Sequence, residues 1–202
     1  AASGDSDLFK AGRKSPSELQ HIIETTHQDS IDFYRGALAI SYFHLENNKE
    51  AIETFYHCNQ NRLSTEQRAE IEFVCALSYF AYELFDRALY HNLVSIKLCK
   101  SKKMRRLLIK NEIQVAAIFR NNSFMDEAEK HFNAALEQAK SDDKDLLFWI
   151  HYHRGFKYKN EEDFSKALSD FELAKKLGEQ LDPYYLIFIN NELGNLYTLT
   201  KP

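Results

Sequence analysis

Two histidines and a run of aspartates are the residues of this sequence that could hold a metal ion or assist hydrolysis. His151 and His153 stand two residues apart, shortly after Asp142, Asp143 and Asp145. Residues two apart on an α-helix point about 200° apart, so the two histidines cannot ligate one ion while the helix persists. The aspartates instead suit the start of a helix, where the helix dipole favours negative charge.

Motifs of the common enzyme classes are missing from the sequence. It contains no glycine-rich phosphate-binding loop and no nucleophile motif. We therefore expect a protein that is not an enzyme and that uses no cofactor and no catalytic metal.

Basic residues gather between positions 100 and 110, in the stretch KSKKMRRLLIK. The whole chain nevertheless has 26 basic and 30 acidic residues, which gives a net charge of -4. Nucleic-acid-binding domains usually carry a clear basic footprint. We therefore interpret the stretch as the solvated face of a helix and expect no nucleic-acid partner.

The three cysteines are odd in number and lack the short spacing of metal ligands. Reduced thiols packed within helices are typical of cytosolic proteins, so we expect a cytoplasmic location. No apolar run approaches the ~18 residues that span a bilayer, and no membrane partner is expected.

The elements that would position any site are helices. Only three prolines and six glycines occur in 202 residues, and 44% of the residues are hydrophobic. Few helix breakers together with abundant Leu, Ala, Glu and Lys favour an all-α fold.

An alanine recurs at a nearly constant interval and serves here as the marker alanine of a repeat. It stands in NNKEAIETF, LFDRALYHN, FMDEAEKHF and DFSKALSDF, with spacings of 37, 40 and 39 residues. Small residues lie twelve positions before it, aromatic residues nine before it, and mostly aromatic residues four after it. The marker alanines are Ala51, Ala88, Ala128 and Ala167; the small residues are Ala39, Ala76, Ala116 and Gly155; the aromatic residues before the marker are Tyr42, Tyr79, Phe119 and Tyr158.

The pattern predicts four helical hairpins and a closing half unit. Gly194 and Tyr197 repeat the spacing of Gly155 and Tyr158, 39 residues later. We expect units near residues 32–65, 69–104, 109–142 and 148–181, a closing helix over 183–199, and a leading amphipathic helix over 15–29. Residues 1–14 are expected to be a flexible tail or a cloning remnant, which leaves 15–202 as the folded domain.

These positions resemble the tetratricopeptide repeat, which has the same order of small, aromatic and alanine residues. The resemblance implies a superhelix of about 4.5 repeats of 37–40 residues, longer than the usual ~34. Each hairpin buries its apolar face against its neighbours, and partners bind along the concave surface formed by the first helix of each unit.

Candidate ligand-binding residues follow from that geometry. Counted from nineteen residues before each marker alanine, positions 2, 5, 9 and 12 of the first helix should face the groove. Exposed aromatic residues there favour a binding surface, although tight curvature could bury them against adjacent helices instead. The expected peptide-binding residues are Phe73, Phe80, Lys110, Ile113, Arg120, Trp149, Tyr152, Phe156, Lys159, Phe188, Asn191 and Asn195.

A narrower resemblance concerns the phrases AEIEFVCALSYFAYELFDRAL and NELGNLY. They are similar to the peptide-sensing regulators of Gram-positive bacteria, the Rap, NprR, PlcR, PrgX and Rgg proteins. That family holds a short signalling peptide in the repeat groove by asparagines and apolar pockets and controls a regulatory output, as in quorum sensing. The resemblance places the asparagine of the family on Asn195.

A general adaptor that binds a helix or tail of a partner protein is the alternative. Co-chaperones of similar fold clamp a terminal carboxylate with lysine and asparagine, but Gly36, Ile40, Phe73 and Leu77 occupy those places here. The closing helix would expose apolar surface, so we also regard a homodimer through this helix as a candidate assembly.

Overall fold

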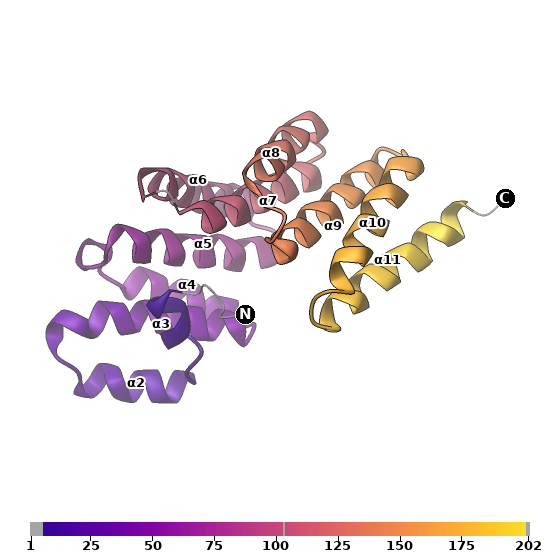
Figure 1. Cartoon of the computed structure of the whole chain (residues 1–202). Helices are drawn as coiled ribbons and strands as arrows, with labels where there is room; N and C mark the ends of the chain where they lie inside the picture. Colours follow the sequence, from indigo (N-terminus) through magenta and orange to yellow (C-terminus); the bar gives the residue numbers. More distant parts are fainter. Residues whose placement is uncertain (1–5, 103, 201–202) are drawn as a thin grey trace. The chain divides into compact units, whose positions relative to one another are not determined.

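The computed structural model describes residues 6–102 and 104–200, and these residues form helices and turns without a β-strand. Figure 1 shows how successive helices pair as hairpins. The helices are α1 (Asp7–Ala11), α2 (Pro16–Thr25), α3 (Ile31–His44), α4 (Asn48–His57), α5 (Thr65–Ala81), α6 (Phe85–Lys102), α7 (Arg105–Asn121), α8 (Met125–Gln138), α9 (Lys144–Asn160), α10 (Phe164–Gly178) and α11 (Tyr184–Thr200), with short 3-10 turns at Gln28–Ser30 and Gln60–Arg62.

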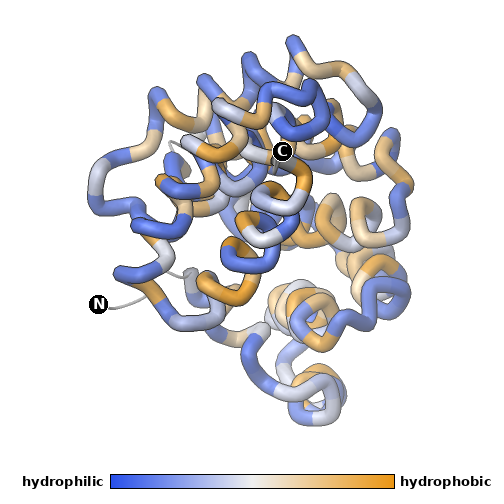
Figure 2. The backbone as a smooth tube through the Cα atoms, turned by 90° about the vertical axis from the view of Figure 1, so that its right-hand side faces the viewer, coloured by the Kyte–Doolittle hydropathy of each residue, from blue (hydrophilic) through white to orange (hydrophobic). Residues whose placement is uncertain are grey.

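The helices fall into two compact units, residues 1–104 and residues 105–202, which we describe separately. The first unit contains the hairpins α3–α4 and α5–α6, and the second contains α7–α8 and α9–α10 followed by α11. The hydropathy colouring in Figure 2 alternates between hydrophobic and hydrophilic residues along the helical tube. The predicted all-α class and helical hairpins are confirmed.

The turn inside each hairpin has one conformation that recurs in all four. The fifth residue before the marker alanine adopts a left-handed backbone, with φ between 57° and 65°. The amide of the next residue then donates to the carbonyl of the predicted aromatic residue, for example Asp163 to Tyr158 at 2.9 Å. This arrangement is a Schellman-type helix ending, which usually carries glycine. Here the four residues are Glu46, Glu83, Ser123 and Glu162.

Side chains cap the starts of several helices. Ser64 forms a reciprocal capping box with Gln67 at the start of α5, and the Asp182 side chain accepts a hydrogen bond from the Tyr184 amide at 2.9 Å. The leading helix, predicted over residues 15–29, is shorter and ends at Thr25. The limits of the repeat units, and the assignment of residues 15–202 to one domain, stay predictions.

Residues 6–14, expected to be a flexible tail or a cloning remnant, contain a short helix, whereas residues 1–5 lie outside the described residues. Residues 7–11 form α1, and Leu8 is only 1% exposed. The Ser41 hydroxyl of α3 donates to the Lys14 carbonyl at 2.6 Å. A single helical turn offers too few residues for an apolar period to be recognised, which is why the sequence pattern missed it.

The core of the second unit consists of two clusters, each spanning three helices. Ala128, Phe132 and Ala135 of α8 pack with residues of α7 and with Leu146 and Ile150 of α9. Phe171 and Ala174 of α10 pack with Phe148 and with Ile189, Leu193 and Leu196 of α11. In this unit, the small and aromatic residues after the marker alanines Ala128 and Ala167 therefore seat the first helix of the following repeat, as the repeat pattern predicts.

Among the described residues, no helix combines the length and apolar character needed to cross a lipid bilayer.

Candidate functional site

Four aromatic side chains of the second unit form one continuous group, which we call the aromatic cluster: Trp149, Tyr152, Phe156 and Phe188. Three of them come from one face of α9, because residues spaced by three and four positions align on a helix. Their ring centroids are 5.5 Å apart for Trp149–Tyr152 and 5.1 Å apart for Tyr152–Phe156. Phe188 of α11 lies 5.6 Å from the Trp149 ring.

All four rings of the aromatic cluster are partly exposed. They rest on the core, since Tyr152 stacks on Phe148 at 5.8 Å and Phe156 meets Phe171 edge-on at 5.5 Å. A surface of this kind presents apolar area together with the Tyr152 hydroxyl, a combination typical of recognition sites. All four residues belong to the predicted set, and the structure brings them together.

Two cations border the aromatic cluster at Phe156. The Arg120 guanidinium of α7 lies 5.3 Å from the Phe156 ring centroid, and the Lys159 ammonium lies 5.2 Å from it. Lys159 also forms an ion pair of 3.1 Å with Glu192 of α11. Among the described residues, the Arg120 guanidinium donates only to the neighbouring Asn121 side chain, at 2.8 and 3.2 Å. Burial lowers the pKa of Arg120.

His153 is a member of this surface that sequence reasoning did not place there. Its ring stacks on Trp149 with centroids 5.8 Å apart, and its Nδ1 is buried without a hydrogen-bond partner in the described part of the chain. Burial, helped by the charge of Arg120, lowers the pKa of His153 to about 3, so the imidazole is neutral near pH 7. The sequence signal that could have identified His153 is the 39-residue period, because His153 stands one repeat before Glu192.

Two predicted binding residues belong to the core instead. Phe73 and Ile113 are each 7% exposed, and Ile113 packs with Phe132 and Leu146. The prediction that they face a ligand is corrected: at position 5 of the second and third repeats, Phe73 and Ile113 are enclosed by the fold instead of facing solvent.

The other predicted residues are at least partly accessible. Phe80 is partly buried in the first unit, with its ring 5.5 Å from Phe85. Lys110 is partly buried on α7, and Asn191 and Asn195 are exposed on α11. Their predicted role in binding stays a prediction.

The two histidines considered as metal ligands have separate partners. His151 lies 2.8 Å from Asp170, whereas His153 stacks on Trp149. In the described part of the chain, the His151 contact is one of three histidine–carboxylate pairs at matching repeat positions, which we call the hairpin clasps. The other two are His91–Glu72 and His131–Glu112, both at 2.6 Å. Each clasp joins the two helices of one hairpin through residues 19 positions apart.

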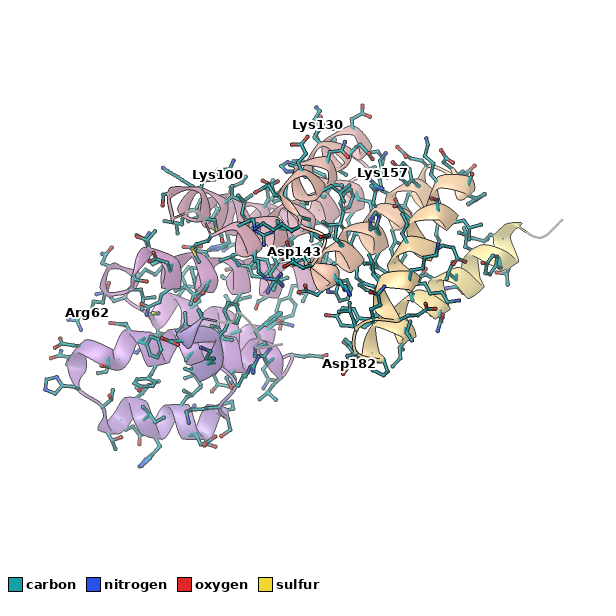
Figure 3. The ribbon with its side chains drawn as sticks, in the orientation of Figure 1. Arg62, Lys100, Lys130, Asp143, Lys157 and Asp182 are labelled. Atoms are coloured by element: carbon teal, nitrogen blue, oxygen red, sulfur yellow. The ribbon has the colours of Figure 1, made fainter. Side chains whose placement is uncertain are left out.

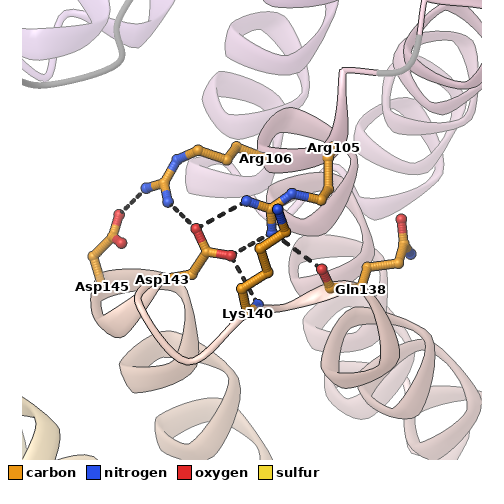
Figure 4. A network of polar contacts seen from close by, with 6 residues as sticks. All are labelled: Arg105, Arg106, Gln138, Lys140, Asp143 and Asp145. Atoms are coloured by element: carbon orange, nitrogen blue, oxygen red, sulfur yellow. Dashed lines mark hydrogen bonds and ion pairs between the residues drawn. The ribbon is translucent and has the colours of Figure 1, made fainter.

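The basic stretch and the aspartates prove to be partners of each other (Figure 4). Arg105 and Arg106 both donate to the buried Asp143 carboxylate, and Arg106 also donates to Asp145 at 2.6 Å. The amide of Lys140 adds a hydrogen bond of 2.9 Å to Asp143. These contacts fix the start of α7 against the loop before α9. The prediction that this basic stretch is a solvated face is therefore wrong for Arg105 and Arg106.

Other charged side chains are also absorbed by the fold. Lys157, labelled in Figure 3, is 6% exposed and pairs with Glu129 at 2.9 Å and with Glu161 at 3.0 Å. These ion pairs hold the Lys157 ammonium within the fold. Lys157 is therefore not one of the cations that border the aromatic cluster.

Comparison with known proteins places the fold. BtubC (BKLC) from P. vanneervenii superposes with a TM-score of 0.70 at 17% identity, over 96% of this chain and 84% of that one. YrrB, a TPR protein with an unusual peptide-binding site, superposes with a TM-score of 0.59 at 18% identity, over 87% of this chain and 84% of YrrB. The chain has the tetratricopeptide-repeat fold.

A third tetratricopeptide-type neighbour bears on the narrower resemblance. The apo form of RapI superposes with a TM-score of 0.66 at 13% identity, over 94% of this chain. The chain spans 58% of the length of RapI. The fold that the Rap-type resemblance implies is therefore confirmed. No protein-family model and no curated protein sequence matches this tetratricopeptide-type chain.

Proposed function

We propose that this tetratricopeptide-type chain binds a short, extended, partly apolar peptide segment on the aromatic cluster. The observation that carries the proposal is the grouping of four partly exposed rings from α9 and α11, bordered by Arg120 and Lys159. Rings that remain accessible in the free protein gain most when a ligand covers them. A binding role without catalysis fits this surface.

The finer proposal is that the segment is a signalling peptide and that its binding controls a regulatory output. The support is the resemblance of the sequence to the Rap-type regulators, together with the likeness of its fold to RapI. A sensor of re-imported peptides would act in the cytoplasm. Asn191 and Asn195 are exposed on α11 and have side chains that can pair with a peptide backbone.

Titration with synthetic peptides of about 5–10 residues tests the binding proposal. Trp149 is the single tryptophan of the chain, so its fluorescence reports directly on the aromatic cluster. Phe188→Ala should weaken binding by about tenfold or more, in line with the loss of an interface anchor. Tyr90→Ala is the matched control, because Tyr90 is 63% exposed on α6 of the first unit.

The same titrations distinguish peptide sensing from the adaptor alternative. Binding of a folded partner protein alone, with no short peptide held at micromolar concentrations, would replace peptide sensing by an adaptor role. Phe156 is a poorer test residue than Phe188, since its ring packs on Phe171 and its truncation would also disturb the core.

Self-association through α11 remains a proposal. Tyr184, Ile187 and Leu199 of this helix are between 57% and 69% exposed. We expect a second copy of the chain to cover this face. Sedimentation that stays monomeric over a wide concentration range, and that is unchanged by Ile187→Asp, would argue against it.

A further inference from the structure

Near the C-terminal end of α9, one side chain pairs with a residue of α11, the first helix of the next repeat. Lys159 stands eight residues before its marker alanine and forms its ion pair with Glu192 of the next helix. One repeat earlier, 39 residues before each of these, stand Arg120 and His153. The charge of Arg120 contributes to the low pKa of His153, as expected for neighbouring groups.

By the repeat period, Arg120 and His153 occupy the positions of Lys159 and Glu192, but this earlier pair lacks an acid. Lys159 pairs with a carboxylate, whereas the residue at the position of that carboxylate in the earlier repeat is an imidazole that is neutral near pH 7 and senses the charge of Arg120. The Nη1 of Arg120 and the Nδ1 of His153 are both buried without a hydrogen-bond partner among the described residues. Within the same residues no carboxylate pairs with Arg120. A partly buried guanidinium without an anion is costly, and native proteins normally pair it.

We infer that the peptide ligand supplies this missing acid, as a carboxylate that pairs with Arg120 while its apolar side chains cover the aromatic cluster. The inference rests on the proposed peptide binding and specifies its ligand class. Arg120 lies 5.3 Å from the Phe156 ring, so the anion would lie at the border of the cluster. A carboxylate fits one guanidinium in a planar, bidentate arrangement. A phosphate dianion would call for a second free cation, and Lys159 is already held by Glu192.

Affinity selection from two synthetic libraries tests the inference. Both contain random octapeptides with biotinylated N-termini; one has free C-terminal acids and the other C-terminal amides. We expect the wild-type protein to retain acidic peptides preferentially. Enrichment of Asp or Glu in both libraries would identify a side-chain carboxylate. Retention of peptides from the free-acid library alone would identify the terminal carboxylate.

Substitution of the cation supplies the direct comparison. Arg120→Gln should weaken binding of the selected acidic peptides by about tenfold or more, the usual range for a hydrogen bond to a charged group. It should leave the melting temperature unchanged or higher, because it removes an unpaired charge from the free protein. Lys130→Gln is the control with the same change in net charge; Lys130 is exposed on α8 and is labelled in Figure 3.

A second substitution places the acid in the protein itself. His153→Glu reproduces the residue found at 192, so Arg120 should then pair internally and the preference for acidic peptides should disappear. His153→Gln, which adds no charge, should retain that preference.

The outcomes are distinguishable. Peptides retained equally by wild type and Arg120→Gln, without preference for acids, would overturn this inference and leave peptide binding intact. An unchanged acidic preference in His153→Glu would also overturn it. Failure of the wild-type protein to retain any peptide would sink the proposed function, and the inference with it.

Discussion

A Cβ atom at Gly155 would lie 2.4 Å from a ring carbon of Phe171, closer than any side chain can approach. The phenylalanine of α10 thus lies directly on the backbone of α9, and glycine is the residue that leaves room for it. The equivalent Gly194 on α11 has no atom within 4 Å of its Cβ position. Glycine therefore occupies the same repeat position twice, once in close contact with a neighbouring ring and once with open space around it.

Alanine substitution at these two glycines should have opposite effects on stability. Gly155→Ala should lower the free energy of unfolding by about 1–3 kcal/mol, because the Phe171 ring has to move out of a filled core. Gly194→Ala should be neutral or stabilising by up to about 1 kcal/mol, since alanine favours a helix over glycine. Denaturant unfolding of both variants checks the contrast, and equal losses would show that α10 does not pack on Gly155 as described.

The left-handed residue in the hairpin turns should respond to glycine. Glu83 has a φ of 57°, which a Cβ atom disfavours and glycine accepts freely. Glu83→Gly should therefore raise the free energy of unfolding by about 0.5–1 kcal/mol. Glu83→Ala removes the same side chain but keeps the Cβ atom and should give no such gain. A thermal melt in which alanine stabilises as much as glycine would contradict the turn geometry.

The hairpin clasps should tolerate exchange of their two residues. The second hairpin of the second unit already has the histidine on its first helix and the acid, Asp170, on its second. Glu112→His alone and His131→Asp alone should each destabilise by about 1–3 kcal/mol, because each leaves a poorly paired group near the core.

The double variant Glu112→His with His131→Asp recreates the contact in the order found at His151 and Asp170. It should recover a large part of the loss, and a double-mutant cycle measures the coupling. Additive losses would mean that the clasp contributes nothing as a pair.

Stability at acid pH should depend on Asp143. Hydrogen bonds from Arg105, the Lys140 amide and Arg106 hold the pKa of Asp143 well below its usual value. A carboxyl group with a lowered pKa in the folded state stabilises the protein above the unfolded value of about 3.9, and this contribution is lost as pH falls below it. Asp143→Asn should therefore destabilise at pH 7 by about 1–3 kcal/mol and flatten the loss of stability between about pH 5 and 2.

Asp142, one residue earlier and exposed, offers the control substitution Asp142→Asn. Its pH profile should follow that of the wild type. Identical profiles for the Asp143 and Asp142 variants would show that the arginine pairs do not act on the folded state.

The repeat was readable from the sequence because its marks are local. The marker alanines, the aromatic residue nine positions earlier and the capping box at Ser64 each depend on residues within one hairpin, and all appear in the structure. A period of 37–40 residues then implies stacked hairpins whatever the remaining residues are.

The candidate site was only partly readable, because exposure depends on what the neighbouring helix places opposite. Tyr152 and Ile113 occupy the same position of their units, yet Ile113 is enclosed by Phe132 and Leu146 while Tyr152 remains partly accessible. The hairpin clasps and the Asp143 network were missed for a related reason. Their side-chain partners are 19 to 39 residues apart, and each residue taken alone looks like an ordinary surface charge.

The most direct measurement is a fluorescence titration of Trp149 with one acidic, apolar octapeptide retained by the wild-type protein, beside the same peptide with its acid replaced by the amide. We expect saturable binding of the acidic form, about tenfold or more weaker binding of the amide form, and no difference between the two forms for Arg120→Gln. Equal affinities of both forms for the wild-type protein would contradict carboxylate recognition at Arg120, and a Trp149 signal that never changes would contradict binding on the aromatic cluster.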